Sequence, residues 1–163
     1  MKNRAAYFGV FTALALILSY VELLIPINFG IPGAKLGLAN LVIVVVLYRN
    51  GWKEAFLLSV VRIVLAGFMF TNLFSILYSL AGGILSLGVM SLLKWKNIFS
   101  VTGVSIAGGV SHNVGQLLVA MAVVETYQVG WYLPALLIAG VLTGLLIGIL
   151  SAGILKRIRF IDG

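Results

Sequence analysis

The segment Val110–Leu118 (VSHNVGQLL) carries a group of polar side chains inside a long apolar run. It contains the only histidine of the chain, His112, together with Ser111, Asn113 and Gln116. On a helix, His112 and Gln116 share a face as i and i+4, and Asn113 and Gln116 are neighbours as i and i+3. Such a face offers a titratable imidazole and amides that both donate and accept hydrogen bonds. This chemistry suits the binding of an anionic or carbonyl-rich group.

A positive charge, Arg62, lies about ten residues into another apolar run, which begins at Trp52. At ~1.5 Å per residue this depth is ~15 Å, close to the midplane of a ~30 Å hydrocarbon core. A charge at that depth is costly unless it faces a cavity or a partner, so Arg62 is a candidate binding residue. The structural alternative is that Arg62 pairs with Glu22 or with helix carbonyls, and that His112 joins helices.

Further polar side chains lie toward the outer side of the proposed bundle. Glu22 ends the first apolar run, Lys35 and Asn40 lie around the start of the second, and Tyr78 lies inside the fourth. We expect these residues to converge on one externally open pocket. The predicted substrate site comprises Glu22, Lys35, Asn40, Arg62, Tyr78, His112, Asn113 and Gln116.

The sequence has few groups for catalysis. Its only acids are Glu22, Glu54, Glu125 and Asp162, and no two of them lie within one helical turn. There is no acidic cluster for magnesium-diphosphate chemistry, no pair of histidines, no P-loop and no GxSxG elbow. Cysteine is absent, which excludes disulfides and thiolate sites. We therefore expect a protein that is not an enzyme and has no metal site and no cofactor.

The composition indicates an integral membrane protein. Hydrophobic residues make up 62% of the 163 residues and charged residues 9%, whereas about a quarter of a soluble domain is charged. The net charge of +7 comes from Lys and Arg at the ends of apolar runs, which indicates membrane topology rather than nucleic-acid binding. We expect one all-α transmembrane domain, surrounded by lipid, in the cytoplasmic membrane of a bacterium.

Six apolar runs predict a six-helix bundle, since a span needs about 20 residues. The expected spans are residues 5–24, 32–48, 52–70, 73–93, 98–124 and 133–155. With both termini cytoplasmic, nine Lys and Arg residues lie inside, Lys35 lies outside and Arg62 lies within a span. A five-span arrangement without the short second run has nearly as good a charge distribution. The strongly apolar segment LVIVVVLY favours six.

Two runs carry small residues at four-residue spacing, which lets helix backbones approach closely. In the sixth run these residues are Gly140, Gly144, Gly148 and Ala152. We expect them to pack inside the bundle. In the first run they are Ala5, Gly9 and Ala13. Here the pattern is compatible with internal packing and with docking of a membrane partner.

Three segments, IPGAKLGLANLVIVVVLY, AGGILSLGVMSLL and GGVSHNVGQLLVA, are similar to signature segments of the Gx transporter family. This family is also described as heptaprenyl diphosphate synthase component I. The resemblance implies the six-span organisation of the S components of energy-coupling factor (ECF) transporters, which work with a transmembrane T subunit and two cytoplasmic ATPases. It also implies a gating loop at Asn28–Lys35 and a T-subunit docking face at Ala5, Gly9 and Ala13.

The hypothesis from the sequence is an S-component-like subunit that binds a small amphipathic or vitamin-like molecule outside and delivers it inward. Two alternatives stay open. One is a membrane subunit of a quinone- or flavin-linked electron-transfer complex, and the other is an accessory subunit of prenyl diphosphate synthesis. A chain with a single aspartate lacks the metal-binding acids of a prenyl synthase, so neither alternative includes catalysis by this chain.

Overall fold

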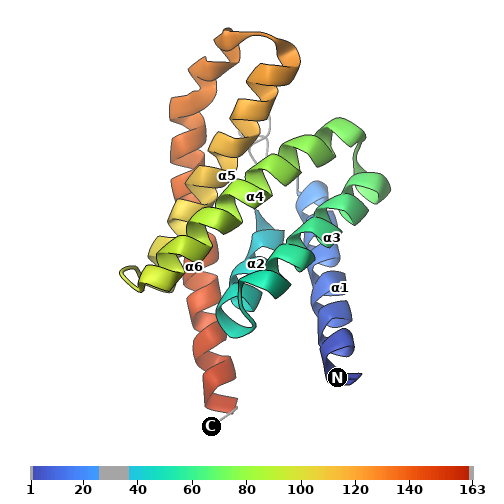
Figure 1. The fold of residues 1–163 in the computed structure, drawn as a ribbon, viewed down its shortest axis with the longest axis vertical. Coiled ribbons are helices and arrows are strands. Elements are labelled where there is room, and N and C mark those ends of the chain that lie inside the picture. The colour runs from blue at the N-terminus through green and yellow to red at the C-terminus, as the bar shows by residue number, and fades with distance from the viewer. Residues whose placement is uncertain (1, 26–36, 162–163) are drawn as a thin grey trace.

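The computed structural model describes residues 2–25 and 37–161 of the chain, and these residues form a bundle of helices (Figure 1). The elements are α1 (Lys2–Leu24), α2 (Leu38–Arg49), α3 (Trp52–Phe70), α4 (Leu73–Lys96), α5 (Val101–Val124), the 3-10 helix η1 (Tyr127–Tyr132) and α6 (Leu133–Ile161). Over the described residues the structure contains no strand. The predicted all-helical bundle is therefore confirmed.

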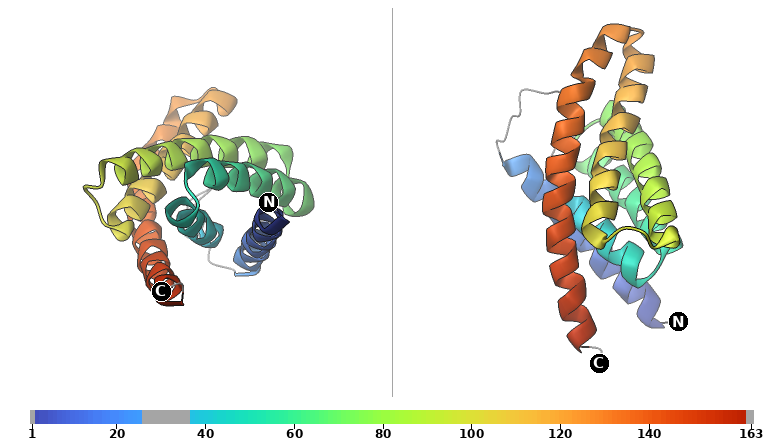
Figure 2. Two further views of the ribbon diagram at one scale, coloured as in Figure 1. Left: turned by 60° about the horizontal axis from the view of Figure 1, so that its bottom comes forward. Right: turned by 90° about the vertical axis from the view of Figure 1, so that its left-hand side faces the viewer.

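Successive helices alternate in direction along the bundle. Both termini lie at one end, together with the α2–α3 and α4–α5 connections, and the α3–α4 and α5–α6 connections lie toward the other (Figure 1). Helices α5 and α6 form a long hairpin, and α4 packs across α5 (Figure 2). Helix α2 lies among α1, α3 and α6.

Four helical segments are long and apolar enough to cross a membrane: Ala5–Leu24, Leu73–Lys96, Val101–Val124 and Tyr127–Ile158. Large apolar side chains face outward along the whole of α1, where Val10 is 66%, Ile17 58% and Leu24 62% exposed. Such a surface is unfavourable in water and favourable in lipid. The exposed side chains and the helix lengths together indicate insertion in a membrane.

Helix α2 is the apolar centre of the bundle. Its six consecutive residues Val42–Leu47 are each at most 4% exposed. A helix that is hydrophobic on every side has to be covered on every side. With 12 residues it is ~18 Å long at ~1.5 Å per residue.

A glycine precedes the first turn of α2. The helix begins at Leu38, after Gly37 with φ of 72°, and the sequence predicted the second span over residues 32–48. A left-handed residue ends regular helical geometry, and glycine adopts it at no steric cost. Residues 32–36 lie outside the described part of the chain. Asn40 therefore lies in the first turn of α2.

Glycines hold α5 against both of its neighbours. A Cβ atom at Gly115 of α5 would lie 2.9 Å from the Ala81 carbonyl oxygen of α4. At Gly144 of α6 it would lie 2.6 Å from Cα of Ile106 in α5. These helices touch backbone to backbone, so side chains larger than hydrogen do not fit at these positions. The expectation that the small residues of the sixth run pack inside the bundle is confirmed.

Candidate functional site

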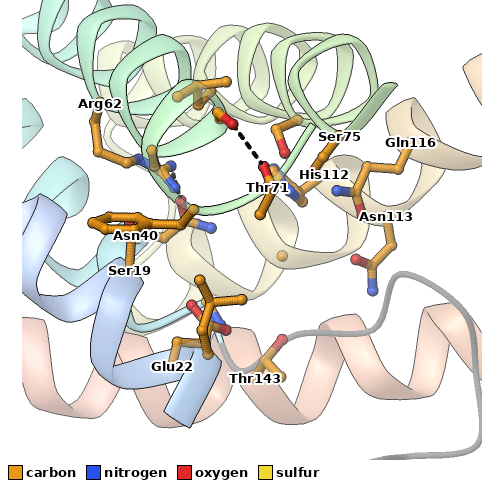
Figure 3. A pocket seen from close by; sticks show the side chains of 18 residues that line it. Ser19, Glu22, Asn40, Arg62, Thr71, Ser75, His112, Asn113, Gln116 and Thr143 are labelled. Atoms are coloured by element: carbon orange, nitrogen blue, oxygen red, sulfur yellow. Dashed lines mark hydrogen bonds between the residues drawn. The ribbon is translucent and has the colours of Figure 1, made fainter. Parts of the chain in front are cut away.

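A polar pocket with a cavity volume of ≈ 90 Å³ lies in the half of the bundle away from the termini (Figure 3). Every one of the six α-helices contributes side chains to it. Its polar lining consists of Ser19, Glu22, Asn40, Arg62, Thr71, Ser75, Ser79, His112, Asn113, Gln116 and Thr143. Six of the eight residues predicted from the sequence line this one cavity: Glu22, Asn40, Arg62, His112, Asn113 and Gln116.

Arg62 supplies the positive charge of this pocket from the middle of α3. Its Nη2 donates to Oδ1 of Asn40 at 3.2 Å. Its Nε is buried and makes no hydrogen bond within the described residues. A guanidinium has five N–H donors, and a buried donor without an acceptor is unfavourable by about 1–3 kcal/mol. An anionic group in the pocket would satisfy this donor.

The carboxylate of Glu22 interacts electrostatically with the Arg62 guanidinium. Its Oε1 also accepts a hydrogen bond from the backbone N–H of Gly37. That bond ties the end of α1 to the start of α2 and so places Asn40 opposite Arg62. Glu22 therefore balances charge and positions a neighbouring element.

His112 and Gln116 face the pocket because of how α5 is packed. Gly82 of α4 lies directly against them, since a Cβ there would be 2.7 Å from the His112 carbonyl oxygen and 2.9 Å from Gln116 Cγ. With α4 and α6 this close on two sides, the polar face of α5 is left toward the pocket. Figure 3 shows both side chains on the cavity side, near Thr71 and Ser75.

Asn113 has a structural contact that the sequence did not indicate. The side chain is 8% exposed, and its Nδ2 donates to the carbonyl oxygen of Leu136 in α6 at 2.7 Å. The amide nitrogen therefore joins α5 to α6, although the side chain lines the pocket. We assign this donor to helix packing rather than to a ligand.

Tyr78 lies in a second, adjoining space rather than in the polar pocket. We name this space the apolar chamber; its cavity volume is ≈ 380 Å³. It is lined by Ser75, Tyr78, Ser79, Gln116, Leu117, Ala120, Val124, Val129, Tyr132 and Leu136.

The predicted site residue Lys35 and the proposed gating loop Asn28–Lys35 fall outside the described residues.

The sequence matches one known protein family over most of its length. The sequence profile of heptaprenyl diphosphate synthase component I matches residues 11–154. The chain belongs to this family. The match extends from α1 to α6 and so includes the polar pocket and the apolar chamber. The family name describes a component of a heptaprenyl diphosphate synthase. Comparison with curated proteins and with solved structures gives no match.

The small residues Ala5, Gly9 and Ala13 of α1 are all exposed. A Cβ atom at Gly9 would meet no atom within 4 Å. The buried side of α1 lies elsewhere, at Ala15, which is 0% exposed. Among the described residues, the small-residue face of α1 is therefore open at Gly9, and Ala5 lines a groove with Val46 of α2 and Leu58 of α3.

Five hydroxyl residues of the pocket were missed from the sequence: Ser19, Thr71, Ser75, Ser79 and Thr143. Ser75 and Ser79 are spaced i and i+4 behind Asn72, whose side chain caps α4 by accepting from the N–H of Ser75. That spacing was a usable signal. The other hydroxyl residues gave no such signal. A helical Ser or Thr hydroxyl can donate to the carbonyl of the preceding turn, as Thr143 does to Ala139, whether or not it lines a pocket.

Proposed function

We propose that this chain is the substrate-binding membrane subunit of an ECF-type transporter, an S-component-like protein that takes up a small amphipathic or vitamin-like molecule. The observation that carries the proposal is the polar pocket around Arg62, His112 and Gln116, inside the helix bundle. Ionisable side chains at membrane depth are expensive and mark substrate paths or sites. A merely structural arginine would have its donors satisfied, whereas Nε of Arg62 is buried without a hydrogen bond among the described residues.

The proposed binding mode assigns a separate task to each side chain. Arg62 gives the charge-assisted hydrogen bond to an anionic or carbonyl-rich end, a bond stronger than its neutral counterpart. His112 and Gln116 orient that end by donating and accepting. The substrate passes through unchanged, since four acids in the whole sequence give no catalytic set, and we propose no enzymatic activity, metal or cofactor for this chain.

The proposed orientation places the terminal end of the bundle in the cytoplasm. Basic residues with described side chains gather at this end: Arg49, Lys53, Lys94, Lys96, Lys156 and Arg157. Positive charge accumulates on the cytoplasmic side of membrane proteins. The polar pocket lies in the other half, so a substrate enters from outside, with both termini in the cytoplasm of a bacterial cell.

The proposed partners are a transmembrane T subunit and two cytoplasmic ATPases. The sequence has no P-loop, so any energy from ATP has to come from another chain. The exposed small residues Ala5, Gly9 and Ala13 let a partner helix approach the backbone of α1 closely. This face lies at the basic end of the bundle, where coupling to cytoplasmic ATPases requires it.

A second candidate function is a non-catalytic membrane subunit of a heptaprenyl diphosphate synthase. The family name favours it over the quinone- or flavin-linked electron-transfer alternative. In this role the chain would anchor a soluble synthase and hold an isoprenoid intermediate, while the partner would carry the metal-binding acids.

Copurification distinguishes the two candidates. The tagged chain is extracted from its native membrane in mild detergent, and the associated proteins are identified by mass spectrometry. A T subunit with ATPases is the expected result. A soluble prenyl synthase subunit without them would replace the transport proposal by the second candidate.

A further inference from the structure

The apolar chamber adjoins the polar pocket. Both are lined by the same three residues, Ser75, Ser79 and Gln116. Ser75 and Ser79 lie on one face of α4, and Gln116 faces them from α5. These three side chains separate the two cavities, so a molecule that occupies both has to pass between them.

The character of the lining changes across this boundary. Beyond Gln116 the chamber walls are Leu117, Ala120 and Val124 of α5 and Leu136 of α6, with Val129 of η1. Two tyrosines, Tyr78 and Tyr132, complete it. Ligand sites of this kind are mainly apolar, with a few polar groups that fix orientation. Here the polar groups stand at one end.

The two volumes set the size of each part of a ligand. The polar pocket of ≈ 90 Å³ has room for a group of several heavy atoms, since about 10–15 Å³ of such volume is enough to hold one water molecule. It therefore accepts a small group such as a carboxylate or a phosphate. The chamber of ≈ 380 Å³ compares with the ~150 Å³ that an apolar cavity needs for one benzene. It has room for roughly two such groups, or about 10–15 carbon atoms.

We infer that the chain binds an amphipath whose small anionic head lies at Arg62, His112 and Gln116 and whose apolar part, of about 10–15 carbons, fills the apolar chamber. This inference rests on the proposed substrate-binding function and specifies its substrate class. A membrane phospholipid matches the space less well, because its two acyl chains contain more carbon atoms than the ≈ 380 Å³ of the chamber accommodates.

The test uses a series of linear alkyl carboxylates from four to eighteen carbons, with binding to the purified full-length protein in amphipol measured by calorimetry. Each buried methylene strengthens binding by up to about fourfold. We expect affinity to rise with chain length and to level off near 10–15 carbons. Affinity that does not depend on length would overturn the inference, and so would a rise that continues to eighteen carbons.

A variant in the chamber gives a second readout. Ala120→Phe fills space inside it, so the twelve-carbon acid should bind at least tenfold more weakly while the four-carbon acid binds as before. Ala122→Phe is the matched control, because Ala122 is exposed on the same helix and does not line the chamber. If Ala120→Phe does not fold, Val124→Phe, at a chamber position that is 54% exposed, replaces it. Equal binding of the twelve-carbon acid to the chamber variant and its control would overturn the inference.

The failure of this inference differs from the failure of the proposed function. If Arg62→Gln weakens binding of the four-carbon acid but chain length and Ala120→Phe have no effect, the polar pocket binds substrate and the chamber does not. If no acid of any length binds to the parent protein, the substrate-binding proposal itself fails. Copurified phospholipid released by Ala120→Phe, with no change for the acids, would assign the chamber to lipid.

Discussion

Helices α1 and α6 carry the same four-residue spacing of small residues, yet the structure places them in opposite surroundings. On α6, a Cβ at Gly140 would lie 2.9 Å from the Gly109 carbonyl oxygen, and at Gly144 2.6 Å from Cα of Ile106. On α1, a Cβ at Gly9 would meet nothing within 4 Å. The spacing thus indicates that a helix can pack closely, but it does not indicate whether the packing partner is another helix of the same chain or a separate protein.

This difference assigns separate tasks to the two helices. The α6 residues hold α5 in position, and α5 carries His112 and Gln116 into the polar pocket. The α1 residues hold nothing within the described chain and stay available to a partner. Changes on α6 should therefore act on folding and on the site, whereas changes on α1 should act on assembly.

The largest effect is expected for Gly144→Leu. The new side chain would overlap the backbone of α5 at Ile106 and Ser105, and such overpacking destabilises by roughly 3 kcal/mol or more when backbone has to move. We expect loss of folded protein, measured by size-exclusion chromatography and thermal unfolding in detergent. Gly88→Leu on α4 is the control, because a Cβ there meets nothing within 4 Å. A melting temperature of Gly144→Leu equal to that of the control would contradict the packing role.

A selective effect is expected for Gly9→Leu. The isolated protein should unfold at the parent's temperature, because the site is open, while recovery of the T subunit in copurification should fall at least tenfold. Gly88→Leu again serves as the control and should recover the T subunit normally. Unchanged recovery with Gly9→Leu would remove the docking face, and a lower melting temperature would assign Gly9 to internal packing.

The smallest effect is expected for Asn113→Ala. This change removes the hydrogen bond from α5 to the Leu136 carbonyl, which contributes about 1 kcal/mol to stability. Ser111→Ala is matched to it on the same helix, because the Ser111 hydroxyl bonds only within α5 among the described residues, to Ala107 and Gly108. If the two variants unfold alike, Asn113 does not join the helices, and its amide is free to serve the ligand.

The fold was largely predictable because apolar run length alone separates membrane helices from connections. The left-handed conformation of Gly37 immediately before α2 could not be predicted, because a local turn of this kind does not change the hydrophobicity pattern. The depth of Arg62 and of His112 identified the polar pocket, because charge and polarity are rare at that depth. Internal packing was expected for the small residues of α6, whereas for those of α1 the spacing alone left internal packing and partner docking open.

The site was predictable in part. Tyr78 was placed with the polar residues because it lies on the outer half of α4, but its face turns toward the apolar chamber. Asn113 was grouped with Gln116 by spacing, and only the position of α6 shows that its amide meets Leu136. Both differences arise from which neighbour a helix face meets, a property of tertiary packing rather than of local sequence.

The central claim is that Arg62 binds the anionic end of a substrate, and ligand retention tests it most directly. Four proteins are purified side by side from native membranes: the parent, Arg62→Gln, His112→Ala and the matched exposed variant Arg157→Gln. The ligand bound to each is quantified by native mass spectrometry. Losing a hydrogen bond to a charged group weakens binding by roughly 1.5–3 kcal/mol, or about one to two decades. We expect an anionic small molecule on the parent and on Arg157→Gln, ten- to hundredfold less on Arg62→Gln, and a smaller loss on His112→Ala. Equal retention by folded Arg62→Gln and Arg157→Gln would contradict the claim and leave Arg62 as a structural residue.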